Sequence, residues 1–215
     1  IRQYIDGQDG DQVVFSWQGG EPTLMGLEFF QKVVKFQKLY QKPGQRVEND
    51  LQTNGVLLND KWAEFLKEHQ FLVGLSIDGP RELHDRYRVT RSGKPTFDKV
   101  MAGVEALKRH GVPFNALVTV NRTNARFPLE VYRFVTRELG ATYVQFNPCV
   151  EPVDFKQTAP QFWQDESIPL IGSRRARPGD LDSIVTDWSV DPEDWGTFLI
   201  AVFEEWVNND LGRVQ

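Results

Sequence analysis

The sequence of 215 residues contains one cysteine, Cys149, and begins at Ile1 without a methionine. A single cysteine excludes an internal disulfide framework and favours a reducing, cytoplasmic setting. No run of about 18 apolar residues is present, which excludes a transmembrane helix and gives no reason to expect a membrane partner. The formal net charge of −5 argues against nucleic-acid binding, because such proteins normally carry a basic patch.

The composition that remains is typical of a globular domain. Hydrophobic residues make up 40% of the chain, which is enough apolar material for a sizeable core. The first residues also lack the apolar stretch of a signal peptide. We therefore interpret the start at Ile1 as a cut through a longer chain.

Short apolar runs alternate with longer segments of helical periodicity, which predicts βαβ units and a parallel sheet. Strands are expected near residues 12, 46, 71, 112 and 142, with helices between them. Asn59 or Asp60 is expected to cap one helix and Thr96 another. A last amphipathic helix from Asp191 is expected to turn these side chains inward: Phe198, Leu199, Val202, Phe203 and Trp206. Residues 150–190 show no clean period and are expected to be mostly irregular.

Small and amide-bearing residues follow successive strands of this expected sheet. The segment 18–23 (Gln-Gly-Gly-Glu-Pro-Thr) follows the first strand and 52–55 (Gln-Thr-Asn-Gly) the second. The segment 76–80 (Ser-Ile-Asp-Gly-Pro) follows the third strand and 145–149 (Gln-Phe-Asn-Pro-Cys) the fifth. Ligands of parallel α/β proteins bind at the carboxyl ends of the strands. These four segments are therefore expected to converge on one site.

The residue types in these segments suit the two ends of an amino acid. Gly19 and Gly20 let a backbone approach a ligand closely, because no Cβ intervenes. Glu21 can pair with an ammonium group, and Ser76 and Arg88 can bind a carboxylate. Each motif alone is more often a simple turn or a solvated loop, so their ordered occurrence carries the interpretation.

Two other kinds of site receive no support from the sequence. His69, His84 and His110 are far apart and show no metal-ligand spacing, so no metal site is expected. We interpret Cys149 as a small buried residue rather than a nucleophile.

Taken together, the motifs resemble the anaerobic sulfatase-maturating enzymes, a branch of the radical S-adenosylmethionine (SAM) superfamily with a SPASM-type C-terminal extension. The resemblance rests on the stretches 15–24, 51–55, 71–80 and 145–146. It implies an α/β fold with a parallel sheet, a partial (β/α) barrel that lacks its first strand. Residues 1–149 would form strands 2–6 of that barrel. Residues 150–215 would form an irregular segment and a helix that lead toward a C-terminal iron–sulfur domain.

The resemblance implies SAM as the cofactor. Gly19, Gly20 and Glu21 would lie against its methionyl amine, whereas Ser76 and Arg88 would hold its carboxylate and ribose side. The resemblance also assigns these residues to other parts of the site: Gln18 and Gln52 to the peptide substrate, and the backbone near Cys149 and Val150 to the adenine.

The implied activity is the oxidation of a serine or cysteine in a sulfatase to formylglycine, after a 5′-deoxyadenosyl radical removes a hydrogen from Cβ. The partners would be the sulfatase polypeptide and an electron-donor protein. The family's 4Fe-4S clusters need a Cys-x3-Cys-x2-Cys motif and further cysteines, which this chain lacks. We therefore expect the isolated chain to hold no cluster, to contain no catalytic residue and to be inactive.

The missing first strand would leave a barrel edge exposed, which favours a dimer in a crystal. Two alternative functions stay open beside sulfatase maturation. One is a radical SAM enzyme that modifies another class of peptide. The other is a cluster-free regulatory or binding protein on the same barrel.

Overall fold

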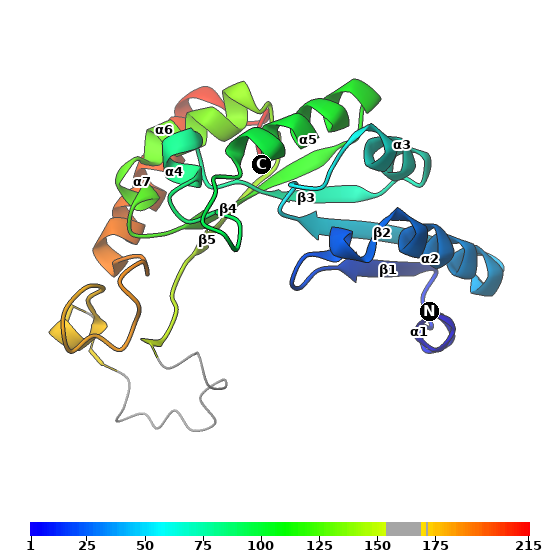
Figure 1. Cartoon of the computed structure of the whole chain (residues 1–215), viewed down its shortest axis with the longest axis horizontal. Helices are drawn as coiled ribbons and strands as arrows, with labels where there is room; N and C mark the ends of the chain where they lie inside the picture. The colour runs from blue at the N-terminus through cyan, green and yellow to red at the C-terminus, as the bar shows by residue number, and fades with distance from the viewer. Residues whose placement is uncertain (154–168, 171) are drawn as a thin grey trace. The chain divides into compact units, whose positions relative to one another are not determined.

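The computed structural model describes residues 1–153, 169–170 and 172–215 (Figure 1). They divide into two compact units. Unit 1 comprises residues 1–77 and 85–116, and unit 2 comprises residues 78–84 and 117–215. Part of the segment expected to be irregular, at 154–168 and 171, lies outside the described residues. Among those that are described, no helix has the length and apolar character needed to cross a membrane.

The elements follow the expected alternation. Unit 1 contains α1 (Arg2–Asp6), β1 (Gln12–Trp17), α2 (Leu27–Tyr40), β2 (Arg46–Thr53), α3 (Asp60–Glu68), β3 (Leu72–Ser76) and α5 (Phe97–His110). Unit 2 contains α4 (Arg81–His84), α6 (Pro128–Arg133), β5 (Val144–Pro148) and α7 (Pro192–Asn209). Strand β4 (Phe114–Val120) begins in unit 1 and ends in unit 2. The strand order β1-β2-β3-β4-β5 is that of the chain, which confirms the expected α/β class.

Strands β1, β2 and β3 pair in parallel, with Val13 opposite Val47 and Leu51 opposite Val73. Burial alternates along most of these strands, as in β1, where Val13 and Phe15 are buried and their neighbours Val14 and Ser16 are exposed. Helix α2 packs on the sheet through Phe30, whose ring lies 5.4 Å from that of Trp17 and 5.5 Å from that of Trp62 in α3. This aromatic cluster packs α2 and α3 together and joins them to Trp17, the last residue of β1.

The helix caps agree with the sequence at α3 but only in part at α5. The side chain of Asn59 accepts a hydrogen bond from the backbone N–H of Trp62, as predicted. Thr96 occupies the N-cap position of α5, as predicted, but its side chain makes no capping hydrogen bond, because its backbone is helical (φ −118°, ψ −11°) rather than extended. Instead Asp85 Oδ1 accepts the N–H groups of Thr96 and Phe97, both at 2.9 Å.

In unit 2, α7 packs against α6 through a buried polar contact and an ion pair. The hydroxyl of Tyr132 donates to Asp210 at 2.8 Å, and Arg133 pairs with Glu205 at 2.9 Å. Phe198 and Val202 are buried, as predicted. The same prediction is wrong for two neighbours, because Leu199 is 40% exposed and Phe203 59% exposed. These two side chains line an open apolar hollow of unit 2 beside Phe146, and no described residue covers them.

Helix α5 approaches the turn after β2 so closely that only glycine fits at position 103. A Cβ at Gly103 would lie 2.8 Å from the carbonyl oxygen of Gly55 and 3.0 Å from Cβ of Leu58. We expect Gly103→Ala to lower the free energy of unfolding by about 1–3 kcal/mol, because the helix must move outward. Urea denaturation measures this. Gly196→Ala in α7 is the control: its Cβ meets nothing within 4 Å, so it should stabilise the chain by about 0.5–1 kcal/mol. Equal effects of the two substitutions would contradict this account.

Candidate cofactor-binding site

The carboxyl ends of β1, β2 and β3 border a cavity of about 620 Å³ in unit 1. Its lining residues are Gln18, Gly19, Gly20, Glu21, Gln52, Thr53, Asn54, Ser76 and Arg88. The structure therefore brings together the residues proposed for the methionyl part of the cofactor and for the substrate. The segment 145–149 and the backbone near Cys149 and Val150, expected at the same site, are not among the residues that line this cavity. Thr53 and Asn54 belong to the lining as well. Their position in the segment 52–55, at the end of the second strand, is the sequence signal that could have identified them as site residues.

The two glycines after β1 leave one wall of this cavity without side chains. Gly19 and Gly20 have φ angles of +92° and +56°, in the region that L side chains rarely adopt. A Cβ built on either glycine meets no atom within 4 Å, so open space adjoins both. Backbone groups at this wall are therefore accessible to a ligand.

The carboxylate of Glu21 is held in place by the residues around it. Its Oε1 accepts from the backbone N–H of Thr23 at 3.0 Å and from the hydroxyls of Thr23 and Thr53 at 2.6 and 2.8 Å. Its Oε2 accepts only from the backbone N–H of Asn54, at 2.7 Å, among the residues that the structure describes. A carboxylate offers about four acceptor sites, two on each oxygen. Oε2 thus keeps one site for a ligand, while Oε1 fixes the turn after β1 to the end of β2.

Sequence reasoning gave Glu21 a ligand-binding role and missed this structural one. The threonine contacts join residues up to 32 positions apart, as between Glu21 and Thr53. Such contacts leave no short-range pattern in the sequence. Only the spacing of Glu21 and Thr23, which brackets the start of the short 3-10 turn Pro22–Met25, is a local capping signal.

Ser76 and Arg88 complete the cavity from two further segments of unit 1. Ser76 ends β3 and is 9% exposed, and its hydroxyl has no hydrogen-bond partner within the described part of the chain. Arg88 lies in the segment before α5 and contributes a planar, always charged donor group. A hydroxyl and a guanidinium lining one cavity are suited to a carboxylate ligand.

The residues around this cavity fit SAM but not an iron–sulfur cluster. Glu21 can accept from the ammonium group of SAM, and Ser76 and Arg88 can donate to its carboxylate. A cluster needs several thiolates, and the chain contains one cysteine. Across residues 1–153, 169–170 and 172–215, no group of three or more His, Cys, Asp and Glu side chains is placed to hold a metal ion.

Cys149 lies in unit 2 and is only half-buried. Burial raises the pKa of its thiol, and the nearby carboxylates of Glu151 and Asp78 raise it further. The thiol is therefore protonated at neutral pH and is a poor nucleophile. Its backbone N–H donates to Val120 and its carbonyl accepts from Val190, both within unit 2. The expected contact between this backbone and an adenine stays a prediction.

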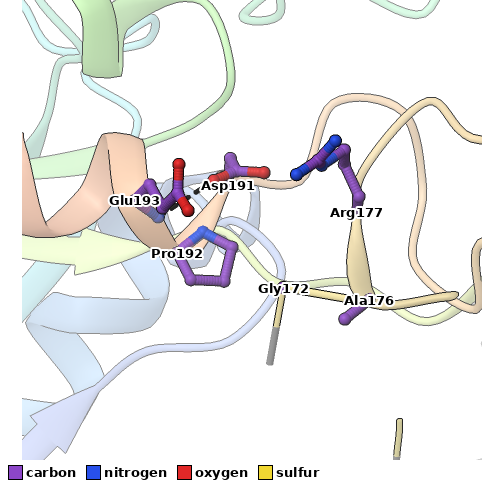
Figure 2. Close-up of a pocket in the computed structure, with 6 residues that line it drawn as sticks. All are labelled: Gly172, Ala176, Arg177, Asp191, Pro192 and Glu193. Carbon is purple, nitrogen blue, oxygen red and sulfur yellow. Dashed lines mark hydrogen bonds between the residues drawn. The ribbon is translucent and has the colours of Figure 1, made fainter. Parts of the chain in front are cut away.

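A second, much smaller hollow lies at the start of α7 (Figure 2). Its volume is about 30 Å³, which is room for little more than water. Asp191 here caps the helix by accepting the backbone N–H of Glu193 at 2.9 Å, drawn as the dashed line in Figure 2. The residues of this hollow therefore cap the start of α7, and the hollow is too small for a cofactor.

Comparison with known protein families places this geometry in context. The model of the radical SAM superfamily matches residues 1–135. The serine-type anaerobic sulfatase-maturating enzyme of Bacteroides thetaiotaomicron is 43% identical over 213 residues, which is 99% of this chain and 48% of that protein. The cysteine-type enzyme of Clostridium novyi is 34% identical, over 92% of this chain and 46% of that protein. The chain spans about half the length of the curated relatives that it matches.

Solved structures show the same relationship. Native anSMEcpe with bound AdoMet matches with a TM-score of 0.79 and 33% identity, over 99% of this chain and 51% of that one. The methyltransferase TsrM from Kitasatospora setae matches with a TM-score of 0.57 at 16% identity, over 93% of this chain and 44% of that one, which concerns the fold alone. The sheet of this chain is thus the partial barrel of this fold. The chain belongs to the radical SAM superfamily, on the branch of the anaerobic sulfatase-maturating enzymes.

Proposed function

We propose that this chain is part of an enzyme that oxidises a serine or cysteine of a sulfatase to formylglycine, and that the cavity in unit 1 binds SAM. One observation carries the proposal: a polar cavity of about 620 Å³ at the carboxyl ends of β1–β3, with one wall of bare glycine backbone. The identity of 43% to a serine-type maturating enzyme supports the reaction.

Each proposed contact follows from the chemistry of the side chain. The free acceptor site on Glu21 Oε2 would bind the ammonium group, beside the backbone of Gly19 and Gly20. Ser76 and Arg88 would donate to the carboxylate and the ribose side. Bound SAM supplies the hydrogen-abstracting chemistry, whereas these residues orient it and keep water away.

We propose that Gln18 and Gln52 lie on the substrate side of the cavity. Both are exposed, so their amide groups are available to a peptide. Native anSMEcpe with bound AdoMet has been solved with the peptides Cp18Cys and Kp18Cys, which supports a polypeptide substrate. An electron-donor protein is the second proposed partner, because SAM must be cleaved reductively. Pairing of two copies along β1, at one end of the strand order, stays a prediction.

We also propose that the 215 residues do not turn over substrate alone. Cluster thiolates must come from residues outside them, because a 4Fe-4S cluster is held by several cysteines and this chain has one. The proposed barrel of residues 1–149 and the segment 150–215 would then belong to a longer protein.

The reaction is tested with the longer protein, reconstituted anaerobically and given SAM, a reductant and a sulfatase-derived peptide. A serine target should lose two hydrogens when its CH₂OH group becomes an aldehyde. A cysteine target should lose two hydrogens and exchange its sulfur for an oxygen from water, which gives the same aldehyde. Mass spectrometry distinguishes these two changes from any other. The same peptide with alanine at the target position is the control. A different mass change would favour an enzyme for another class of peptide. No change in any peptide, with no cleavage of SAM, would favour the cluster-free binding protein.

A further inference from the structure

Arg88 lies at the base of a small hairpin formed by residues 89–95 of unit 1. Val89 and Pro95 form an antiparallel bridge, and the backbone N–H of Thr90 donates to the carbonyl of Lys94 at 2.8 Å. These hydrogen bonds stabilise the hairpin internally but do not connect it to the rest of unit 1. The position of Arg88 at the cavity therefore depends on contacts outside the hairpin.

Two side chains provide those contacts at the start of α5. The hydroxyl of Thr96 donates to the carbonyl oxygen of Arg88 at 2.6 Å. The carboxylate of Asp85 accepts the N–H groups of Thr96 and Phe97, both at 2.9 Å. Thr96 is 6% exposed, so water cannot easily replace its hydrogen bond. Because Asp85 caps the helix, the hydroxyl of Thr96 is available to hold Arg88.

Helix α5 in turn contacts another part of the cavity. Gly103 in the middle of the helix lies against Gly55, which ends the segment 52–55. The contact is so close that a Cβ at position 103 would lie 2.8 Å from the carbonyl oxygen of Gly55. Gln52, Thr53 and Asn54 of this segment line the cavity. The helix therefore links the end of β2 to Arg88 through tight contacts.

We propose that Thr96 and Asp85 are positioning residues. They fix the backbone of Arg88, so that its guanidinium is preorganised to bind the ligand in the cavity. A guanidinium binds a carboxylate best in a planar, two-bond geometry, which tolerates little displacement. The inference rests on the proposed function, because it takes that ligand to be SAM.

The test is the dissociation constant for SAM in the longer, anaerobically reconstituted protein. Thr96→Val replaces the hydroxyl by a methyl group of similar shape, and we expect the dissociation constant to rise about tenfold. Thr96→Ser restores the hydroxyl and should restore the affinity. Ser92→Ala removes an exposed hydroxyl from the same hairpin, one that bonds Thr90 rather than Arg88, and should leave the affinity unchanged.

Arg88→Ala, measured in parallel, separates two kinds of failure. If Arg88→Ala weakens SAM binding but Thr96→Val does not, the positioning role is wrong and the proposed function stands. If neither substitution changes the affinity, Arg88 does not bind SAM, and both proposals lose their support. Circular dichroism verifies that each variant is folded. Thr96→Ala, which adds no atoms to the core, replaces the valine variant if that variant does not fold.

Discussion

Glu21→Ala is expected to weaken SAM binding by about 10- to 100-fold, which corresponds to the loss of one hydrogen bond to a charged group. The same substitution should also lower the free energy of unfolding by about 1–3 kcal/mol. It removes the acceptor for the hydroxyl of Thr53, which is 1% exposed, and for the backbone N–H of Asn54. Titration calorimetry and urea denaturation of the same preparation measure the two effects.

Two further variants separate binding from stability. Thr53→Val removes one hydrogen bond to Glu21 and leaves the free acceptor site on Oε2, so it should affect stability more than SAM affinity. Glu28→Ala, which removes a carboxylate of α2 outside the cavity lining, should change neither quantity. Unchanged affinity in Glu21→Ala would remove Glu21 from the SAM site and leave it only the structural role.

Asp210→Ala is expected to lower the free energy of unfolding by about 1–3 kcal/mol at neutral pH. The carboxylate of Asp210 is 2% exposed and accepts from the hydroxyl of Tyr132, which is itself 2% exposed. Removing the acceptor leaves this hydroxyl buried without a partner. Glu204→Ala, on an exposed face of α7, is the matched control and should have little effect.

The contribution of Asp210 should also depend on pH. Burial acts to raise the pKa of this carboxyl, but hydrogen bonds from Arg213 and Tyr132 outweigh burial and lower the pKa. A lowered pKa in the folded state stabilises the protein above the unfolded-state pKa of about 3.9. This stabilisation is lost as the pH falls through the lowered value. The difference in stability between wild type and Asp210→Ala should therefore be larger at pH 7 and shrink as the pH falls through the lowered pKa of Asp210. A constant difference would contradict the assignment.

The sheet and its long helices could be predicted because their signals are local. Apolar residues recur every second position in β1, and Gly111 ends α5 in the left-handed conformation that the sequence indicates. The short helices α1 and α4 were not predicted, because five or four residues are too few to show a helical period. The N-cap position of α5 at Thr96 could be predicted, but the side chain that accepts its N–H groups could not, since Asp85 lies 11 positions before Thr96.

The composition of the site could be predicted because parallel strands bring their carboxyl ends together. Gly19, Glu21, Gln52 and Ser76 each lie at or just after the carboxyl end of a strand, and all line one cavity. The network that holds the site could not be predicted. Thr53 and Thr96 look like ordinary turn and cap residues in the sequence, and their roles come from tertiary contacts. The prediction that Leu199 and Phe203 point inward was wrong, because an apolar stripe on a helix does not indicate which other residues cover it.

The most direct test of the SAM site is a crystal structure of the longer protein with SAM. The account predicts that the methionyl ammonium group lies within hydrogen-bonding distance of Glu21 Oε2, and that the carboxylate contacts Ser76 and Arg88. SAM bound elsewhere, with the cavity at β1–β3 empty, would contradict it.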